Sequence, residues 1–189
     1  MLRILIFFYL SLFLTATIQA QEDFDLKPYK ESRKKISLSG MKVLGSWGGV
    51  NLASGIAGSI YTEGSQQYFF QMNALWGVVN VLASRFASRS IERETYPDNL
   101  DKLIMDQRKL ERTFFYSAAL DVAYVGAGFG LLNWSRSEDV HQERIEGYAY
   151  SFIVQGAFIL ALDAAMYLLH KRNRKKRLEL KNRMNYYYE

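Results

Sequence analysis

Long uncharged runs alternate with charged connectors along most of the chain. Four of these runs contain no Lys, Arg or Glu, and they comprise residues 43–61, 68–84, 114–134 and 148–169. Each is about 17–22 residues long, which is the length that a helix needs to cross the hydrocarbon core of a membrane. A helix on the surface of a soluble protein would instead carry charges along its outer face. The pattern therefore predicts four transmembrane helices.

The composition supports this pattern and excludes several kinds of site. The chain has 24 Lys and Arg and 19 Asp and Glu, yet only Asp121 and Asp163 lie inside the four runs. Because the chain has no Cys, a disulfide framework, a thiolate nucleophile and a Cys-ligated metal are excluded. Its two His are too few for a His-rich metal site. We therefore expect no metal and no cofactor.

The start of the chain is typical of a secretory signal peptide. Arg3 supplies a positive charge, residues 4–14 form an apolar core, and Ala20 precedes a polar stretch. The alternative is an uncleaved first membrane helix, close to the lower limit of a spanning length. We expect a signal peptide over residues 1–20, followed by a basic juxtamembrane segment over residues 21–42.

The basic residues of the connectors bear on orientation. Lys and Arg are frequent in residues 21–41, 85–113 and 170–189, and sparse in residues 62–67 and 135–147. The positive-inside rule places the three basic segments in the cytoplasm. A cleaved signal followed by four spans would place them outside, whereas a retained first helix satisfies the rule. Both topologies stay open, and both have short loops on one side and basic helical extensions on the other.

Each predicted span carries small and polar residues on one helix face. Residues three or four positions apart in a helix share a face. In the first two spans these residues are Gly48, Asn51, Gly55, Gly58, Asn73, Gly77, Asn80 and Ser84. In the last two they are Ser117, Asp121, Tyr124, Gly128, Gly156, Ile159 and Asp163. Because Gly permits close approach of helix backbones, we expect Gly48, Gly55, Gly58, Gly77 and Gly128 to lie at helix contacts.

The amide and carboxylate residues form a predicted intramembrane polar cluster. At about 1.5 Å per residue, Asn51, Asn80, Asp121 and Asp163 lie roughly 15–23 Å from the span ends that face the connectors with few basic residues. Asn73 shares a face of the second span with Asn80. Each half of the chain is a helix, a connector and a helix, with a dominant amide or carboxylate in each helix. We therefore expect two similar helical hairpins.

The two carboxylates leave several interpretations open. A charge in hydrocarbon costs about 2.5–3.5 kcal/mol, and no Lys or Arg lies within the four runs to pair with Asp121 or Asp163. The carboxylates are protonated, hydrogen-bonded to the Asn residues, or hold a cation or water. The favoured role is structural, in the bundle or in a homo-oligomer; the alternative is a proton- or cation-coupled transporter or channel. The two carboxylates could act as acid and base in an intramembrane enzyme, but no nucleophile or metal site accompanies them, so we expect no enzymatic activity.

Two connectors carry further signals. The run Lys171–Arg177 opens a basic tail over residues 170–189 and has no interleaved aromatic residues, so it predicts binding to anionic lipids and not to nucleic acid. In the middle connector, Asp98 is the expected N-cap of a helix. The apolar stripe that follows predicts an interfacial helix running into the third span, and it contains Leu100, Leu103, Ile104 and Leu110.

Spaced motifs across nearly the whole chain resemble an uncharacterised family of small multi-pass bacterial membrane proteins with an N-terminal signal sequence. They are Gly40-Met41-Lys42-Val43-Leu44-Gly45-Ser46-Trp47 with Asn51, Met72-Asn73-Ala74-Leu75-Trp76-Gly77-Val78-Val79-Asn80, Leu120-Asp121-Val122-Ala123-Tyr124, and Gln155-Gly156 with Asp163 and Met166-Tyr167. The resemblance implies a helical membrane protein and no particular activity.

The sequence therefore predicts an all-α protein, a four-helix transmembrane bundle over residues 43–169 with an N-terminal signal helix. The expected function is that of a structural or interaction protein of the bacterial envelope, in the inner membrane with lipid as its partner. A soluble secreted helical bundle is the remaining alternative.

Overall fold

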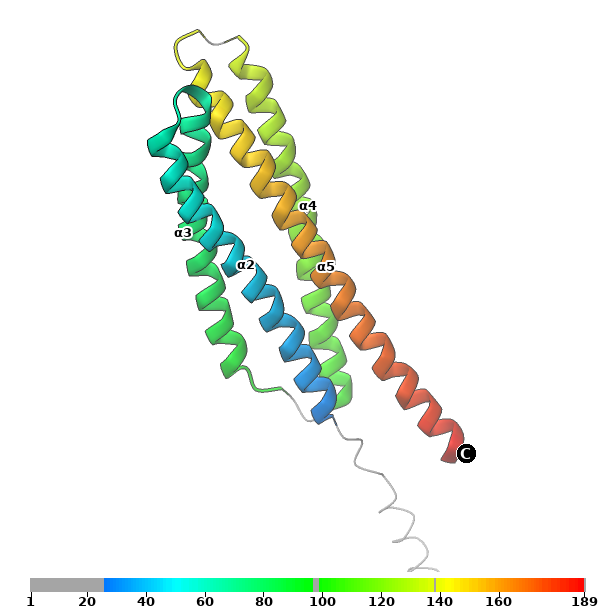
Figure 1. Cartoon of the computed structure of the whole chain (residues 1–189). Coiled ribbons are helices and arrows are strands. Elements are labelled where there is room, and N and C mark those ends of the chain that lie inside the picture. Colours follow the sequence, from blue (N-terminus) through cyan, green and yellow to red (C-terminus); the bar gives the residue numbers. More distant parts are fainter. Residues whose placement is uncertain (1–25, 97–98, 138, 189) are drawn as a thin grey trace, which may run out of the picture.

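The computed structural model describes residues 26–96, 99–137 and 139–188, which fold into four long α-helices. The helices are α2 (Lys27–Tyr61), α3 (Gly64–Arg93), α4 (Leu100–Ser135) and α5 (Gln142–Tyr188) (Figure 1). The all-α prediction is confirmed. The predicted signal peptide, and with it the choice between cleavage and retention, lies outside the described residues.

The helices form two antiparallel hairpins, as predicted. α2 packs along α3, and α4 packs along α5 (Figure 1). Gly64 adopts a φ of 60°, a conformation open to a residue without Cβ, and so permits the tight turn between α2 and α3. The hairpins meet chiefly where α5 packs on α3, and to a lesser extent on α2. Among the described helices, α4 makes close backbone contact with α5 alone.

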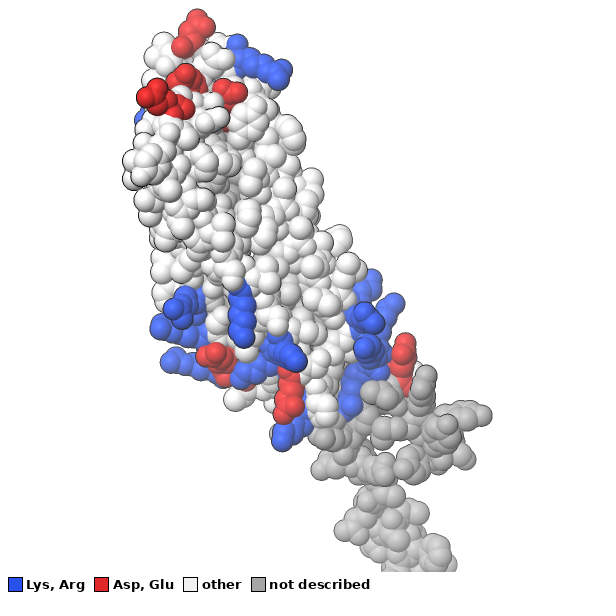
Figure 2. Space-filling view, viewed as in Figure 1, with Lys and Arg blue, Asp and Glu red and all other residues white. Residues whose placement is uncertain are grey.

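The helices continue well beyond the uncharged runs. α2 begins at Lys27, α3 ends at Arg93, and α5 extends through the basic tail to Tyr188. Lys and Arg therefore gather at the end of the bundle that contains these termini, which we call the basic end (Figure 2). The two short loops lie at the opposite end, which we call the loop end (Figure 1). Between the basic end and the loop end, the visible face of the bundle carries no charged residue (Figure 2).

The start of α4 corrects two expectations. Its N-cap is Asn99 and not Asp98, because the Asn99 side chain accepts hydrogen bonds from the backbone N–H groups of Asp101 and Lys102 at 2.9 and 3.1 Å. The expected run of the apolar stripe into the third span is confirmed, because the stripe belongs to the continuous α4. Its expected interfacial position is wrong, because Leu103 and Ile104 are buried inside the bundle.

The interior of the bundle is unusually polar and its exterior unusually apolar. Among the described residues, buried polar or charged residues outnumber buried hydrophobic ones, and the latter are Tyr29, Leu103, Ile104, Ala149 and Met166. Many large apolar side chains are instead exposed along the helices, including Val50, Ile56, Leu75, Leu82, Leu120, Val122, Phe129 and Leu168. A water-soluble helical protein has the opposite distribution.

Two of the described helices, α4 and α5, are long and apolar enough to cross a membrane. The core helix of a soluble protein can pass the same test, but it is mostly buried. Of the most apolar 18 residues of α4 and α5, only 6% and 17% are buried inside the molecule. α2 and α3 do not pass, because the Gly, Ser and Asn of their inward faces lower the mean hydropathy.

Candidate functional site

The side chain of Gln155 on α5 is the centre of a buried hydrogen-bond network. Its Nε2 donates to Oδ1 of Asn51 and to Oδ1 of Asn73, both at 2.8 Å. Its Oε1 accepts from Nε1 of Trp47 at 2.9 Å and from Nδ2 of Asn80 at 3.3 Å. Two donated and two accepted bonds use the full capacity of the amide. We call these five residues, together with Ser151, the Gln155 network.

The network fixes the register of three helices. Asn51 and Trp47 come from α2, Asn73 and Asn80 from α3, and Gln155 from α5. The side chains of all three Asn residues and of Gln155 are buried. Ser151, one turn before Gln155, donates a further bond to Oδ1 of Asn73 at 3.0 Å. A buried amide without a partner is costly, so this arrangement selects one relative position of the helices.

Close approach of α2 and α3 brings the amides within reach of one another. A Cβ added at Gly48 would lie 2.9 Å from the Gly77 carbonyl oxygen, and one added at Gly77 would lie 2.7 Å from the Gly48 carbonyl oxygen. Both distances are shorter than real Cβ contacts. The two helix backbones thus touch where these glycines face each other, as small residues permit in membrane helices.

The other predicted packing glycines also lie at helix contacts. A Cβ at Gly55 would lie 2.7 Å from Cα of Ala74, and one at Gly128 would lie 2.7 Å from Cγ1 of Ile153. Gly58 faces the ring of Phe70. Gly147, absent from the predicted set, lets the start of α5 approach α3, since a Cβ there would lie 2.8 Å from the Phe69 nitrogen.

The predicted carboxylates form a second group, separate from the Gln155 network. Asp163 lies eight residues after Gln155 on α5, about 12 Å further toward the basic end. It interacts electrostatically with Asp121 of α4 and is hydrogen-bonded to the Ser117 side chain. Among the described residues, the side chains of Asn51, Asn73 and Asn80 form hydrogen bonds with the side chains of Gln155 and Ser151 and not with either carboxylate.

A cavity of about 320 Å³ connects the two polar groups. Its polar lining comes from Asn80, Gln155, Asp121 and Asp163, and its aromatic lining from Trp76 and Tyr124. Trp76 meets the edge of Tyr124 with ring centroids 5.6 Å apart. The Oδ2 atom of Asp121 and the Nε1 atom of Trp76 are buried without a hydrogen-bond partner. The cavity therefore contains polar atoms that a proton, a water or a small polar ligand could satisfy.

Gln155, Ser151 and Trp47 were not among the predicted cluster residues. The helical spacing contained a signal for two of them: Ser151, Gln155, Ile159 and Asp163 recur every four residues, so they share the α5 face that was assigned to Asp163. Trp47 lies four residues before Asn51 and so shares its face of α2, but its large apolar ring is more typical of packing than of a polar cluster. It stacks on Phe158 with centroids 4.1 Å apart while its N–H reaches Gln155.

The basic end holds a separate set of buried ionic contacts. Arg174 of α5 forms a bidentate salt bridge with Glu111 of α4, with both N–O distances 2.9 Å. Arg33 of α2 contacts Glu94 at 3.2 Å and lies over the ring of Tyr96 at 4.9 Å. These contacts lie outside the uncharged runs. The first holds α4 to α5, and the second holds α2 to the end of α3, so each lies within one hairpin.

His170 lies just beyond the uncharged run of α5 and is fully buried. Its Nε2 is 3.3 Å from Oγ of Ser37, and its ring stacks on Phe114 with centroids 5.6 Å apart. Burial and, to a smaller extent, the nearby Arg33 together lower the pKa of His170 to about 4, against an opposing effect of Glu111. The imidazole is therefore neutral at physiological pH.

A metal centre finds no support in the part of the chain that the structure describes. No group of three His, Asp or Glu residues there could hold a metal ion. The interior does contain hydrogen bonding by amides and a carboxylate oxygen of Asp121 without a hydrogen-bond partner.

One family model matches the chain, over residues 43–164, and it describes a family of unknown function, DUF6992. No curated protein and no solved structure matches the chain. The match includes part of each hairpin and every residue of the Gln155 network, and it extends over more than half of the sequence. The chain therefore belongs to the DUF6992 family of unknown function.

Proposed function

We propose that the protein is an integral membrane protein of the bacterial inner membrane, in which the Gln155 network holds a four-helix bundle together for a structural or interaction role. The observation that carries the proposal is the inverted distribution of residues. Leu120 on α4 is 71% exposed, whereas Gln155 on α5 is 2% exposed. Lipid favours this arrangement, because apolar side chains are soluble in it and unpaired amides are not.

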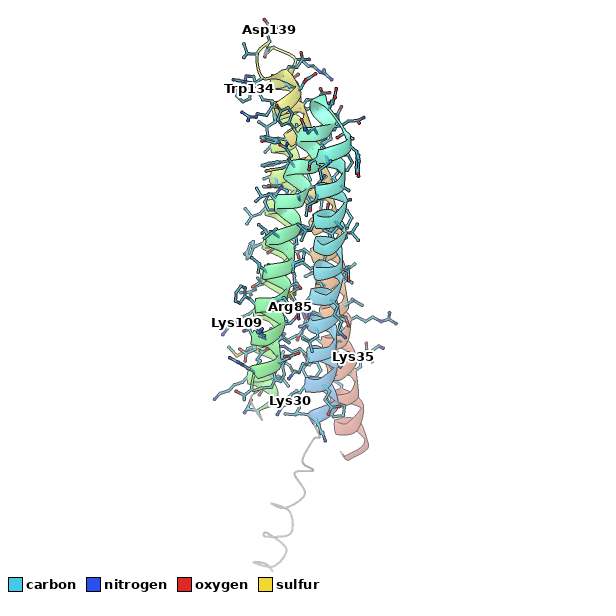
Figure 3. All side chains as sticks on the ribbon, turned by 60° about the vertical axis from the view of Figure 1, so that its left-hand side comes forward. Lys30, Lys35, Arg85, Lys109, Trp134 and Asp139 are labelled. Atoms are coloured by element: carbon cyan, nitrogen blue, oxygen red, sulfur yellow. The ribbon has the colours of Figure 1, made fainter. Side chains whose placement is uncertain are left out.

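The dimensions of the uncharged region agree with a membrane. At about 1.5 Å per residue, residues 148–169 of α5 span about 33 Å, close to the roughly 30 Å of a hydrocarbon core. Tyr61, Trp134 and Tyr150 are exposed toward the loop end of this region. Exposed Trp and Tyr are typical of the membrane–water interface. Lys30, Lys35, Arg85 and Lys109 mark the other boundary, opposite Trp134 and Asp139 (Figure 3).

The proposed role requires no chemistry beyond assembly. In membranes, apolar surface adds little to helix association, so packing and hydrogen bonds between helices determine it. The Gln155 network and the facing glycines supply both. The same features would serve a homo-oligomer, and the basic tail from Lys171 to Arg177 would bind anionic lipid headgroups. The proposal includes no enzymatic activity and no nucleic-acid partner.

Membrane extraction at alkaline pH tests the proposal. The full chain is expressed in bacteria, the membranes are washed with sodium carbonate, and the pellet and supernatant are compared. We expect the protein in the pellet with intrinsic membrane proteins. Release into the supernatant with peripheral proteins would contradict the proposal and favour a soluble secreted bundle.

An arginine substitution makes the same test residue-specific. Leu120 is exposed in the middle of α4. Leu120→Arg would cost about 2.5–3.5 kcal/mol if lipid surrounds this position, and almost nothing if water does. We expect Leu120→Arg to lower the fraction retained in the membrane, while Arg112→Lys at the exposed basic end leaves it unchanged.

The cavity beside Asp121 and Asp163 favours a second candidate, a proton- or cation-coupled transporter or channel. Its support is the buried, unpaired Oδ2 atom of Asp121 together with the volume next to it. Carboxylates without basic partners are frequent in ion pathways. Reconstituted vesicles would then show pH-dependent flux that is lost in Asp121→Asn with Asp163→Asn. Absence of flux at every pH in a folded preparation would exclude this candidate.

A further inference from the structure

An apolar groove runs between α2 and α5 in the half of the molecule nearest the basic end. Its volume is about 480 Å³. Small residues form part of its floor, chiefly Gly40 from α2 and Ala161 and Ala165 from α5. Its larger walls include Val43 and Phe158. The surface is almost entirely hydrocarbon, so it offers an occupant dispersion contacts and very few hydrogen bonds.

The length of the groove corresponds to one leaflet of a bilayer. Along α5 it is lined from Phe158 to Leu169, which is about 16 Å of helix. Half of a hydrocarbon core of roughly 30 Å is about 15 Å. The groove begins at the basic end and stops near the middle of the uncharged run of α5.

Two basic side chains lie where the groove meets the basic end. Lys35 lines the groove from α2 (Figure 3). Arg172 continues the groove face of α5, three residues after Leu169 and seven after Ala165. Both are exposed. Just below them the Oγ of Ser32 donates to Oδ1 of Asn173 at 2.9 Å, which fixes α2 and α5 side by side.

We propose that this groove binds one acyl chain of an anionic phospholipid and that Lys35 and Arg172 bind its phosphate. The inference rests on the membrane location proposed above and adds a specific lipid site to it. An apolar channel of leaflet length with two cations at its headgroup end matches the amphipathic shape of a phospholipid. Net negative charge on the headgroup strengthens the contact with both cations.

A second copy of this chain fits the groove less well. A symmetric dimer presents the same patch from both subunits. With its axis along the membrane normal, it would bring the Lys35 residues of the two copies to the same level, and like charges close together repel. The cations at the end of the groove thus favour a negatively charged lipid over a self-contact.

Native mass spectrometry tests the charge requirement. The full chain in mild detergent is titrated with phosphatidylglycerol or phosphatidylcholine, and the bound fraction is measured. We expect phosphatidylglycerol to bind more tightly, and Lys35→Gln with Arg172→Gln to weaken it by about fivefold per charge removed. The matched control removes two exposed basic residues away from the groove, Arg89→Gln and Arg112→Gln, and should retain tight binding.

A second variant tests the groove itself. Ala165→Phe places a ring in the channel without changing charge, and we expect it to weaken binding of both lipids. Ala161→Cys introduces a single cysteine, because the chain has none, and disulfide cross-linking through it in the membrane reports a second copy. Efficient cross-linking at this position would overturn the lipid proposal in favour of a self-contact.

The outcomes separate this inference from the membrane proposal. If the protein is released by carbonate, the membrane location fails and the lipid site fails with it. If the protein is retained but Lys35→Gln with Arg172→Gln binds phosphatidylglycerol as tightly as the unaltered chain does, the lipid site alone fails. Equal weakening by both pairs of substitutions would show diffuse attraction to the basic end, and would also overturn the specific site.

Discussion

Replacement of Gln155 by Leu is the most informative single substitution in the bundle. Leu is close to Gln in size but can neither donate nor accept a hydrogen bond. Gln155→Leu therefore removes the two bonds to Asn51 and Asn73 and the two from Trp47 and Asn80 at once. All three Asn side chains stay buried between helices, where water has little access to replace the lost partner.

The expected loss follows from these four bonds. Hydrogen bonds between membrane helices contribute about 0.6 kcal/mol each on average and about 1.7 kcal/mol at most. Four average bonds give a loss of about 2.4 kcal/mol. Asn51 still donates to the Trp47 carbonyl oxygen and Asn73 still accepts from Ser151. Asn80 is left without a described partner, which costs about 1–3 kcal/mol, so 2.4 kcal/mol is nearer the lower end of the expected range.

The assay is reversible unfolding in mixed micelles of a mild detergent and dodecyl sulfate, followed by Trp fluorescence. Gln71→Leu is the matched control, because Gln71 is exposed on α3 and belongs to no described hydrogen bond of the network. We expect Gln155→Leu to lower the free energy of unfolding by at least 2 kcal/mol and Gln71→Leu to change it by less than about 0.5 kcal/mol. Equal effects of the two substitutions would refute the role assigned to the network.

Three further substitutions test other contacts in the same assay. Gly77→Ala should destabilise the bundle by about 1–3 kcal/mol through overpacking at the α2–α3 contact, whereas Gly49→Ala, with open space around its Cβ position, should be neutral or slightly stabilising. Arg174→Met leaves the Glu111 carboxylate buried without its bidentate partner and should cost about 2–4 kcal/mol. Burial lowers the pKa of His170 in the folded protein to about 4, so protonation of His170 opposes folding. The free energy of unfolding should therefore fall as the pH drops from about 6.5 to 4, by at most about 3 kcal/mol. His170→Gln should flatten that pH dependence.

The helices and their pairing could be predicted from the sequence because charge placement is a strong local signal. Runs with only Asp121 and Asp163 as charges mark the central part of each helix, and short connectors make neighbours antiparallel. The expected basic helical extensions are present, and buried contacts such as Arg174–Glu111 support them. Charge placement did not predict that these extensions reach as far as Lys27 and Tyr188.

Only part of the Gln155 network could be read from the sequence, and its connections could not. Spacing placed Asn51, Asn73 and Asn80 on inward faces, which is where the structure has them. Spacing within one helix says nothing about which side chain of another helix will face them. The hydrogen bond from Gln155 to Asn51 joins residues 104 positions apart, so the central role of Gln155 is seen only in the packing of α5 on the first hairpin.

The separation of the carboxylates from the amides has the same origin. Asp121 lies on α4, whose backbone is in close contact with α5 alone among the described helices. It therefore meets Asp163 of α5 and the cavity, while the amides of α2 and α3 meet Gln155. The division leaves the amide group saturated and the carboxylate group partly unsatisfied, which is why assembly and ion exchange are assigned to different residues.

The most direct test of the account is the solvent that surrounds the middle of α4. The chain has no Cys, so Leu120→Cys carries a single nitroxide label, and Arg112→Cys at the basic end provides the comparison. In vesicles, collisions of the label with oxygen, which concentrates in lipid, are compared with collisions with a water-soluble nickel chelate. Lipid contact predicts that oxygen dominates at position 120 and the nickel chelate at position 112. Dominance of the nickel chelate at both positions would contradict the membrane location.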